Sequence, residues 1–334
     1  MSRRLLSLYF SLFLALPLIA APLKIGVFIP GQREGSPIYD SLASGAEQFA
    51  SENPGSSVRI FEAGFNQAEW QEKLTSFVST GRYDIIITSN PSLPDLIEAI
   101  APLFPSQKFI CLDGYKPGIS TLHTILYNQT EQGYIAGYLA GLISVSTLPG
   151  ANPQKKAGMI IGQHYPVMDT LIAPGFEKGL KAVDPSFSLD IRVLGNWYDA
   201  TKASDLAKSM ISGGVDVILP ICGSASQGVV KAAKDSGRYL VFFDSDEYSR
   251  APGTILGCVA LKQKELSYAK LKEYAQKATP WGRADVVGVK EGYIELLDKH
   301  PSYTQNLPES IRARMSELIA GISSGAVSFP APTL

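Results

Sequence analysis

Short apolar runs alternate along the chain with longer segments that have a helical pattern of apolar and polar positions. The short runs are rich in β-branched residues, which is typical of strands buried in a parallel sheet. We predict strands at residues 23–29, 58–61, 84–88, 108–112, 159–161, 191–194, 216–220 and 239–243. The helical pattern covers residues 39–52, 68–79, 95–100, 132–144, 173–183, 204–212, 227–235 and 262–277. This alternation predicts repeated βαβ units and therefore an α/β fold.

Two stretches of the chain resemble each other, one beginning at Phe65 and the other at Trp197. In each, the aromatic residue is followed by a helical leucine, a glycine suited to end the helix, and an aspartate that opens a strand. The matching pairs are Leu74 and Leu206, Gly81 and Gly213, and Asp84 and Asp216. The next strand runs into Asp113 in the first unit and into Asp244 in the second. The chain therefore contains two similar α/β units.

The N-terminus has the pattern of a secretory signal peptide. Two arginines precede an apolar run over residues 5–19, and Ala20 and Ala21 offer a small-residue cleavage site. A membrane anchor is the alternative, but this run is shorter than the roughly 20 residues that a membrane span needs. We predict a signal peptide at residues 1–21 and a periplasmic or extracellular protein. Because no cysteine lies near the cleavage site, we expect no lipid anchor.

Composition narrows the class of protein further. The chain has 334 residues, which favours two units over a single core, and a formal net charge of −1. A nucleic-acid partner is not expected, since such proteins normally carry a basic patch or a high pI. Cys111, Cys222 and Cys258 lie in apolar runs, so we expect buried free thiols rather than disulfides or a zinc site. We predict no metal and no cofactor.

Ligands of open parallel sheets bind beyond the carboxyl ends of the strands. The loops at those ends offer aromatic, carboxylate and small polar residues, and two such units facing each other would form one cleft. The candidates for ligand binding are Tyr39, Asn90, Asp113, Tyr165, Trp197 and Asp244. Each has a structural alternative: the aspartates could cap turns, and the aromatic side chains could belong to the core.

Catalysis is not expected. None of the three histidines, His123, His164 and His300, has a credible catalytic setting. The chain also has no nucleophile elbow, zinc-protease motif, P-loop or dinucleotide-binding motif after its first strand. We predict a protein with no catalytic residues.

Several motifs resemble the basic membrane protein family of substrate-binding proteins from ABC importers. They are GFNQAEWQEKL, YDIIITSNPSL, KFICLDG, EQGYIAGYLAGLIS, GVDVILPICGSASQGVVKAAKDSG and VFFDSDEY, and the resemblance extends over about residues 23–297. It implies a type I periplasmic-binding fold, with two parallel-sheet lobes joined by three hinge strands and a ligand cleft between them. It also implies binding roles for Asp113, Trp197, Gly223 and Asp244.

The resemblance divides the mature chain into two lobes. Lobe 1 is expected at 22–127 plus about 260–282, and lobe 2 at 128–258 plus about 283–325. The expected mechanism is closure of the hinge around the ligand, after which the closed form docks on the permease of an ABC transporter. We expect a monomer. A sensor that reports to a membrane receptor could use the same fold.

Two departures from the nucleoside-binding pattern bear on the identity of the ligand. The loop after the first strand reads PGQREGSPIYDS instead of an acidic loop ending in Ser-Phe-Asn. The family's lysine after the second crossover is replaced by Leu261, with Lys262 adjacent. These features and the bulky Trp197 are similar to the riboflavin-binding branch. Riboflavin is therefore the expected ligand, and a purine nucleoside is the alternative.

Overall fold

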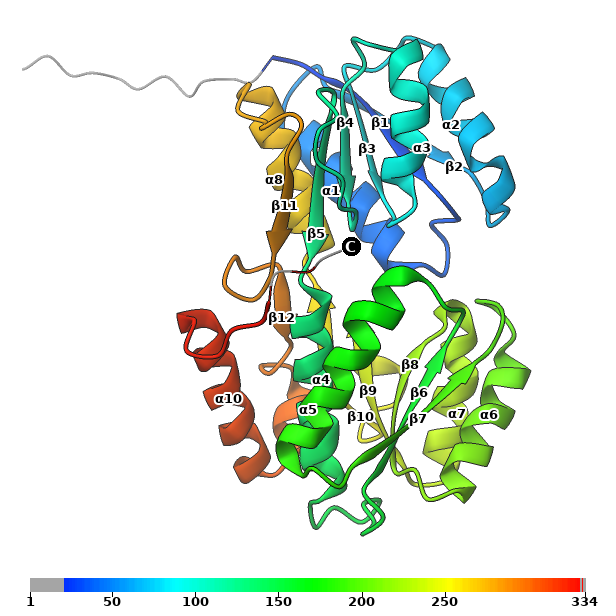
Figure 1. Cartoon of the computed structure of the whole chain (residues 1–334), viewed down its shortest axis with the longest axis vertical. Coiled ribbons are helices and arrows are strands. Elements are labelled where there is room, and N and C mark those ends of the chain that lie inside the picture. Colours follow the sequence, from blue (N-terminus) through cyan, green and yellow to red (C-terminus); the bar gives the residue numbers. More distant parts are fainter. Residues whose placement is uncertain (1–20, 331, 333–334) are drawn as a thin grey trace, which may run out of the picture.

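The computed structural model describes residues 21–330 and 332, and it consists of two α/β lobes (Figure 1). Residues 1–20 of the expected signal peptide lie outside the described part of the chain. The first sheet has the strand order β11-β5-β4-β3-β1-β2, and all its neighbouring strands are parallel. Its strands are β1 (Lys24–Ile29), β2 (Ser57–Glu62), β3 (Ile85–Ser89), β4 (Phe109–Leu112), β5 (Leu122–Tyr127) and β11 (Ala284–Val287).

Helices cover both faces of the first sheet, as continuous apolar strands require. The helices are α1 (Pro37–Glu52), α2 (Trp70–Ser79), α3 (Leu93–Ile100) and α8 (Gln263–Ala275). Alternate strand residues face opposite sides. Ile25, Val27 and Ile87 share one core with α1, whereas Phe28 and Ile86 share a separate core with α2 and α3. Helix α8 packs beside α1, although more than two hundred residues separate them in the sequence.

The second sheet repeats the first, with the strand order β12-β10-β9-β8-β6-β7. Its strands are β6 (Lys156–Ile161), β7 (Ser188–Val193), β8 (Val217–Ile221), β9 (Tyr239–Asp244), β10 (Ile255–Leu261) and β12 (Ile294–Leu296). Only the edge strand β12 is antiparallel among the described pairs. Its helices are α4 (Gln129–Ser144), α5 (Ala173–Val183), α6 (Ala200–Ser212), α7 (Ser226–Asp235), α9 (Pro301–Asn306) and α10 (Glu309–Ser324).

The internal repeat corresponds to equivalent places in the two sheets. The two similar stretches form the α2–β3 unit and the α6–β8 unit, and β3 and β8 occupy the same position in the strand order of their sheets. Strands β4 and β9 also occupy equivalent positions. Asp113 directly follows β4, and Asp244 is the last residue of β9. The two aspartates therefore lie at equivalent corners of the two lobes, as the repeat predicted.

The chain crosses between the lobes three times: after β5, after β10 and between β11 and β12. The expected third boundary at about 282 is too early, because β11 pairs with β5 in the first sheet. The second crossing likewise follows Leu261, a few residues later than expected. Strand β11 was missed because its four residues, ADVV, are too few to show a strand pattern of their own.

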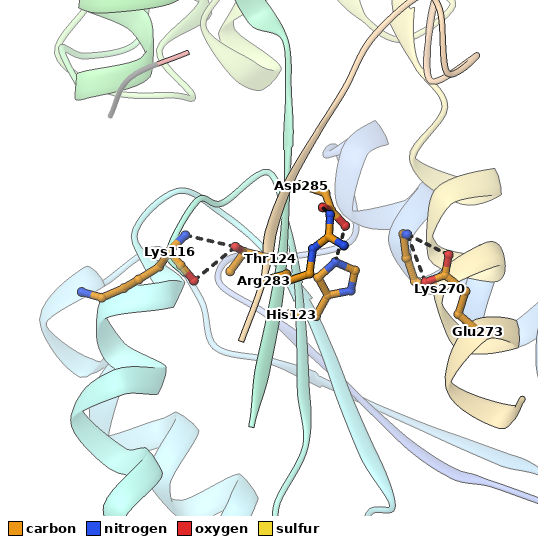
Figure 2. Close-up of polar contacts among 7 residues, drawn as sticks. All are labelled: Lys116, His123, Thr124, Lys270, Glu273, Arg283 and Asp285. Atoms are coloured by element: carbon orange, nitrogen blue, oxygen red, sulfur yellow. Dashed lines mark hydrogen bonds and ion pairs between the residues drawn. The ribbon is translucent and has the colours of Figure 1, made fainter. Parts of the chain in front are cut away.

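Side-chain contacts attach β11 to the first lobe (Figure 2). His123 Nε2 on β5 lies 2.9 Å from Asp285 Oδ2 on β11, and Arg283 donates to the other carboxylate oxygen at 2.9 Å. Burial lowers the pKa of His123, and the hydrogen bond to Asp285 opposes that shift. Because β11 pairs with β5 as far as Val287 and Tyr127, the third crossing begins after Val287.

Cys111, Cys222 and Cys258 are free and buried, as predicted. Within residues 21–330, no helix combines the length and apolar character that crossing a bilayer requires. Helix α4, whose apolar sequence includes Gly137 and Gly141, is buried between its sheet and α5.

Candidate ligand-binding site between the lobes

The site is organised around Asp113 and Asp244, which lie at the carboxyl ends of corresponding strands. Both have left-handed backbone conformations, with φ of 53° and 69°. Aspartate tolerates this conformation better than most residues, because its short polar side chain makes local hydrogen bonds. The sharp turn at each strand end therefore sets the direction of the carboxylate that follows.

The two carboxylates lie close enough for their charges to interact. Burial raises the pKa of Asp113 well above its usual value, and the charge of Asp244 raises it further. Burial also raises the pKa of Asp244 to about 6, while a hydrogen bond from Gln132 acts in the opposite direction. Asp113 Oδ1 is buried and has no hydrogen-bond partner among the described residues. The pair thus offers acceptors that are free for a ligand with hydroxyl or N–H donors.

The first lobe contributes Tyr39 from α1 and Asn90 from the loop after β3. Asn90 Nδ2 donates to the Tyr39 hydroxyl at 3.2 Å, and Asn90 Oδ1 accepts from the backbone N–H of Ser92 at 2.9 Å. A Cβ placed on Gly31 would lie 2.9 Å from the Tyr39 ring and 3.5 Å from the Phe65 ring. Tyr39 therefore packs against the loop after β1, beside Phe65, which is more than half exposed.

The second lobe contributes an aromatic pair. The ring centroids of Tyr165 and Trp197 are 6.4 Å apart, with the ring planes tilted by 47°. The Trp197 ring lies against the backbone of Gly162, where a Cβ would be 2.6 Å away. Gly223 has a φ of 59°, and a Cβ there would lie 2.9 Å from the Trp197 carbonyl oxygen. Gly223 thus contributes space for Trp197, not a side-chain contact of its own.

The two lobes approach each other at this face. The pKa of Tyr165 is raised well above its usual value, first by burial and then by Asp244, Asp113 and Tyr39. Two of those three residues belong to the opposite lobe. Across the same face, a Cβ on Gly35 would lie 4.0 Å from the Cβ of Ser224. The structure therefore brings all seven predicted residues into one connected set, at the face where the lobes meet.

Three buried polar residues of the set escaped prediction. Gln132, near the start of α4, donates to Asp244 Oδ1 at 3.1 Å. Tyr127, at the end of β5, donates to Gln263 Oε1 at 2.7 Å, and both aspartates raise its pKa after burial does. Only the EQG motif around Gln132 could have pointed to one of these three residues, because an isolated glutamine carries no sequence signal.

The structure accounts for Lys262, which stands beside the family's lysine position. Its ammonium group forms a 2.5 Å ion pair with Glu295 on β12. The pKa of Lys262 is raised, chiefly by this hydrogen bond. The lysine is therefore engaged at the edge of the second sheet.

The histidines all have structural contacts. His123 pairs with Asp285 as described above, His164 Nδ1 lies 2.7 Å from Asp169, and His300 Nδ1 accepts from the backbone N–H of Ser302 at 3.1 Å. Within the described part of the chain, no cluster of three His, Cys, Asp or Glu side chains is placed to hold a metal ion.

Two open hollows lie away from the interlobe face. One of about 590 Å³ borders α2, between Ala68 and Ser76, and one of about 460 Å³ lies beside Arg238 and Tyr239 at the start of β9. Neither contains a residue of the interlobe set. The site is thus located by strand ends and convergent polar groups, following the rule for open parallel sheets.

Comparisons with known proteins bear on the family and the fold of the chain. The chain is 29% identical over 281 residues to the CD4+ T-cell-stimulating antigen of Listeria monocytogenes, covering 79% of this chain and 75% of that protein. It is 26% identical over 248 residues to a purine-binding protein of Brucella abortus, covering 73% and 65%. An ABC transporter solute-binding protein from Aeropyrum pernix has the same fold, with a TM-score of 0.79 and 22% identity over 93% of this chain and 94% of that one.

The family comparison extends over nearly the whole described structure. Residues 23–328 match the family described as ABC transporter substrate-binding protein, PnrA-like. The two-lobed fold, the paired strand ends and this match agree with one another. The chain therefore belongs to the PnrA-like substrate-binding proteins of ABC transporters, the basic membrane protein family that its motifs resemble.

Proposed function

We propose that this solute-binding protein captures riboflavin, a neutral molecule with a wide ring system and a hydroxylated chain. The observation that carries the proposal is the combination of an aromatic pair, Tyr165 and Trp197, with the carboxylates Asp113 and Asp244. Aromatic side chains recognise a flat ring by stacking, and carboxylates accept hydrogen bonds from hydroxyls.

The charge of the site supports a neutral, donor-rich ligand. The carboxylate of Asp113 has Asp244 as its charged neighbour, and Lys262 is paired with Glu295. A ligand phosphate would meet negative charge here, whereas hydroxyls would supply the missing partner of Asp113 Oδ1. This favours riboflavin over its phosphorylated form.

A purine nucleoside is the second candidate, because the similar Brucella abortus protein is described as purine-binding. A nucleoside also combines a ring with hydroxyls, so the same carboxylates could bind its ribose. The bulk of the Tyr165 and Trp197 pair and the engaged Lys262 favour the larger flavin ring.

The proposed mechanism is closure of the lobes on the ligand, followed by docking of the closed form on a permease. Residues 1–21 would direct export, and the mature protein would act as a monomer. The family consists of transporter components, which supports uptake over a sensory role.

Isothermal titration with riboflavin, adenosine and guanosine tests the proposal, after the purified protein is inspected for flavin absorption. We expect riboflavin to bind at least tenfold more tightly than either nucleoside. Tight binding of a nucleoside with no binding of riboflavin would make the nucleoside the ligand and leave the assignment of the site unchanged. Binding of none of the three would overturn both assignments.

Substitution of Trp197 tests the place of the site. Trp197→Ala should weaken binding by about 100-fold, because the stacking surface is lost, while circular dichroism stays unchanged. Tyr198→Ala is the matched control, since Tyr198 is the adjacent aromatic residue and its side chain is 72% exposed. Equal affinities of the two variants would place the ligand elsewhere.

A further inference from the structure

Gln132 lies where the hinge and the interlobe site meet. It is in the first turn of α4, directly after the first crossing, and its side chain is fully buried. Its Nε2 donates to Asp244 Oδ1 at 3.1 Å and to the backbone carbonyl of Val259 on β10 at 2.9 Å. One side chain thus joins the helix of the first crossing, the strand of the second crossing and a carboxylate of the site.

The orientation of the carboxamide follows from its partners. Both groups near Nε2 are acceptors, so the nitrogen must face them and the oxygen must point away. Oε1 is buried and has no hydrogen-bond partner among the residues that the structure describes. Because Oε1 and Nε2 belong to the same planar group, this oxygen lies near Asp244 while facing away from the carboxylate that Nε2 contacts. A buried carbonyl without a partner is costly, and a ligand donor would remove that cost.

Gln263 provides a comparison within the same molecule. It begins α8, directly after the second crossing, and is also fully buried. Its Nε2 donates to Ser89 Oγ at 2.7 Å, and its Oε1 accepts from the Tyr127 hydroxyl at 2.7 Å. Both ends of this carboxamide are paired within the protein. The unpaired oxygen of Gln132 is therefore not a general property of the hinge glutamines.

We propose that Gln132 is a ligand-binding residue: its carbonyl oxygen accepts a hydrogen bond from the bound molecule while its amide orients Asp244. This inference rests on the proposed function and adds a third acceptor to the two aspartates. Since the amide also binds the β10 backbone, occupation of the site is connected directly to the second crossing.

Gln132→Met tests the role, because methionine has a similar length and can form neither hydrogen bond. We expect the affinity for riboflavin, or for the nucleoside that the parent binds, to fall about 10- to 100-fold. Ser144→Ala is the matched control. Ser144 lies at the other end of α4, is buried, and donates to the buried carboxylate of Asp216 at 3.0 Å. It should lower the melting temperature and leave the affinity unchanged.

Gln132→Glu separates a binding role from a structural one. The titratable groups that interact with Asp244 are Asp113 after β4, Tyr127 on β5 and Tyr165 after β6. At pH 7.5 the new carboxylate cannot donate to Asp244 and binding should be weak. Burial and the neighbouring Asp244 favour the protonated acid as the pH falls to 5.5, and this acid can donate, so the affinity gap between parent and variant should narrow.

The outcomes distinguish the role of Gln132 from the proposed function of the protein. A parent that binds riboflavin or a nucleoside, together with a Gln132→Met variant of equal affinity, would overturn the role of Gln132 and leave the proposed function standing. Equal affinity losses in Gln132→Met and Ser144→Ala would also overturn it, because the loss would then reflect general stability. A parent that binds none of the three probes would remove the proposed function and this inference together.

Discussion

At the residue scale, Asp113 and Asp244 place like charges near each other in a buried setting. Burial and like charge both oppose folding, because each penalises the ionised form of the aspartates. The left-handed backbone at each aspartate adds to that cost. Buried carboxylates and a left-handed backbone are typical of sites where a bound ligand supplies the missing hydrogen-bond partners. For Asp113 and Asp244 they therefore favour ligand binding over turn capping.

The pH dependence of stability follows from the raised pKa of Asp244. Its folded-state value of about 6 lies above the roughly 3.9 of an unfolded chain, so its contribution to stability is lost as the pH rises from about 4 through 6. Asp244→Asn should therefore raise the melting temperature of the ligand-free protein at pH 7.5, by about 2–4 °C, and by less at pH 5. The same variant should bind ligand at least tenfold more weakly.

Thermal unfolding at the two pH values, with the exposed Asp205→Asn as control, provides the measurement. A variant that melts below the parent at pH 7.5 would show that Asp244 stabilises the fold instead of straining it.

At the element scale, α4 connects the lobes and is buried along nearly its whole length. Its glycines allow α5 to approach closely: a Cβ on Gly137 would lie 2.0 Å from the Phe176 carbonyl oxygen. A backbone atom cannot move aside as a flexible side chain can. The helix–helix contact therefore depends on the absence of a side chain at this position.

Gly137→Ala should destabilise the protein by about 2–4 kcal/mol, although alanine is the better helix former. Gly321→Ala in α10 is the control, since a Cβ there meets only the Val327 side chain, at 3.0 Å. That change should be within about 1 kcal/mol of neutral. Chemical denaturation measures both, and equal stabilities of the two variants would contradict the close packing of α4 and α5.

At the scale of the whole molecule, the lobes meet at the carboxyl ends of the strands of both sheets. A Cβ on Gly35, in the loop before α1, would lie 4.0 Å from the Ser224 Cβ of the second lobe. The three crossings are the covalent connections between the lobes (Figure 1). A ligand bound between the lobes would be released only when this contact opens. Release should therefore depend on movement of the lobes and not only on the strength of local contacts.

A disulfide across this contact tests that dependence. The Cβ separation of 4.0 Å between positions 35 and 224 lies within the range of disulfides, so Gly35→Cys combined with Ser224→Cys should cross-link on oxidation, although the φ of 74° at position 35 strains any side chain placed there. The native cysteines are buried and should not interfere. We expect ligand release from the oxidised, loaded protein to slow by about 100-fold and to recover on reduction.

Stopped-flow dilution measures the release rate, with each single cysteine variant as control. Unchanged release from a fully cross-linked sample would mean that ligand exchange does not need the lobes to separate at this point.

Much of this architecture follows from local patterns in the chain. Apolar β-branched runs and helical periodicity predict the buried strands and their covering helices, because local pattern and burial coincide there. The repeat from Phe65 and Trp197 predicts the equivalence of Asp113 and Asp244. Strand β11 and the true third crossing escaped prediction, since a short half-buried strand depends on its partner β5 and not on its own residues.

The sequence by itself determined the α/β class, the two units, the buried cysteines and the candidate residues, because each depends on neighbours close along the chain. Only the tertiary structure showed that Gly223 makes room for Trp197, that Lys262 pairs with Glu295, and that Gln132 contacts Asp244. Those contacts join residues 26 to 112 positions apart, and no local pattern records which buried polar groups finally meet. The polar interior of the site is therefore a property of the folded lobes. The presence of two lobes, by contrast, follows from the order of the strands and helices along the chain.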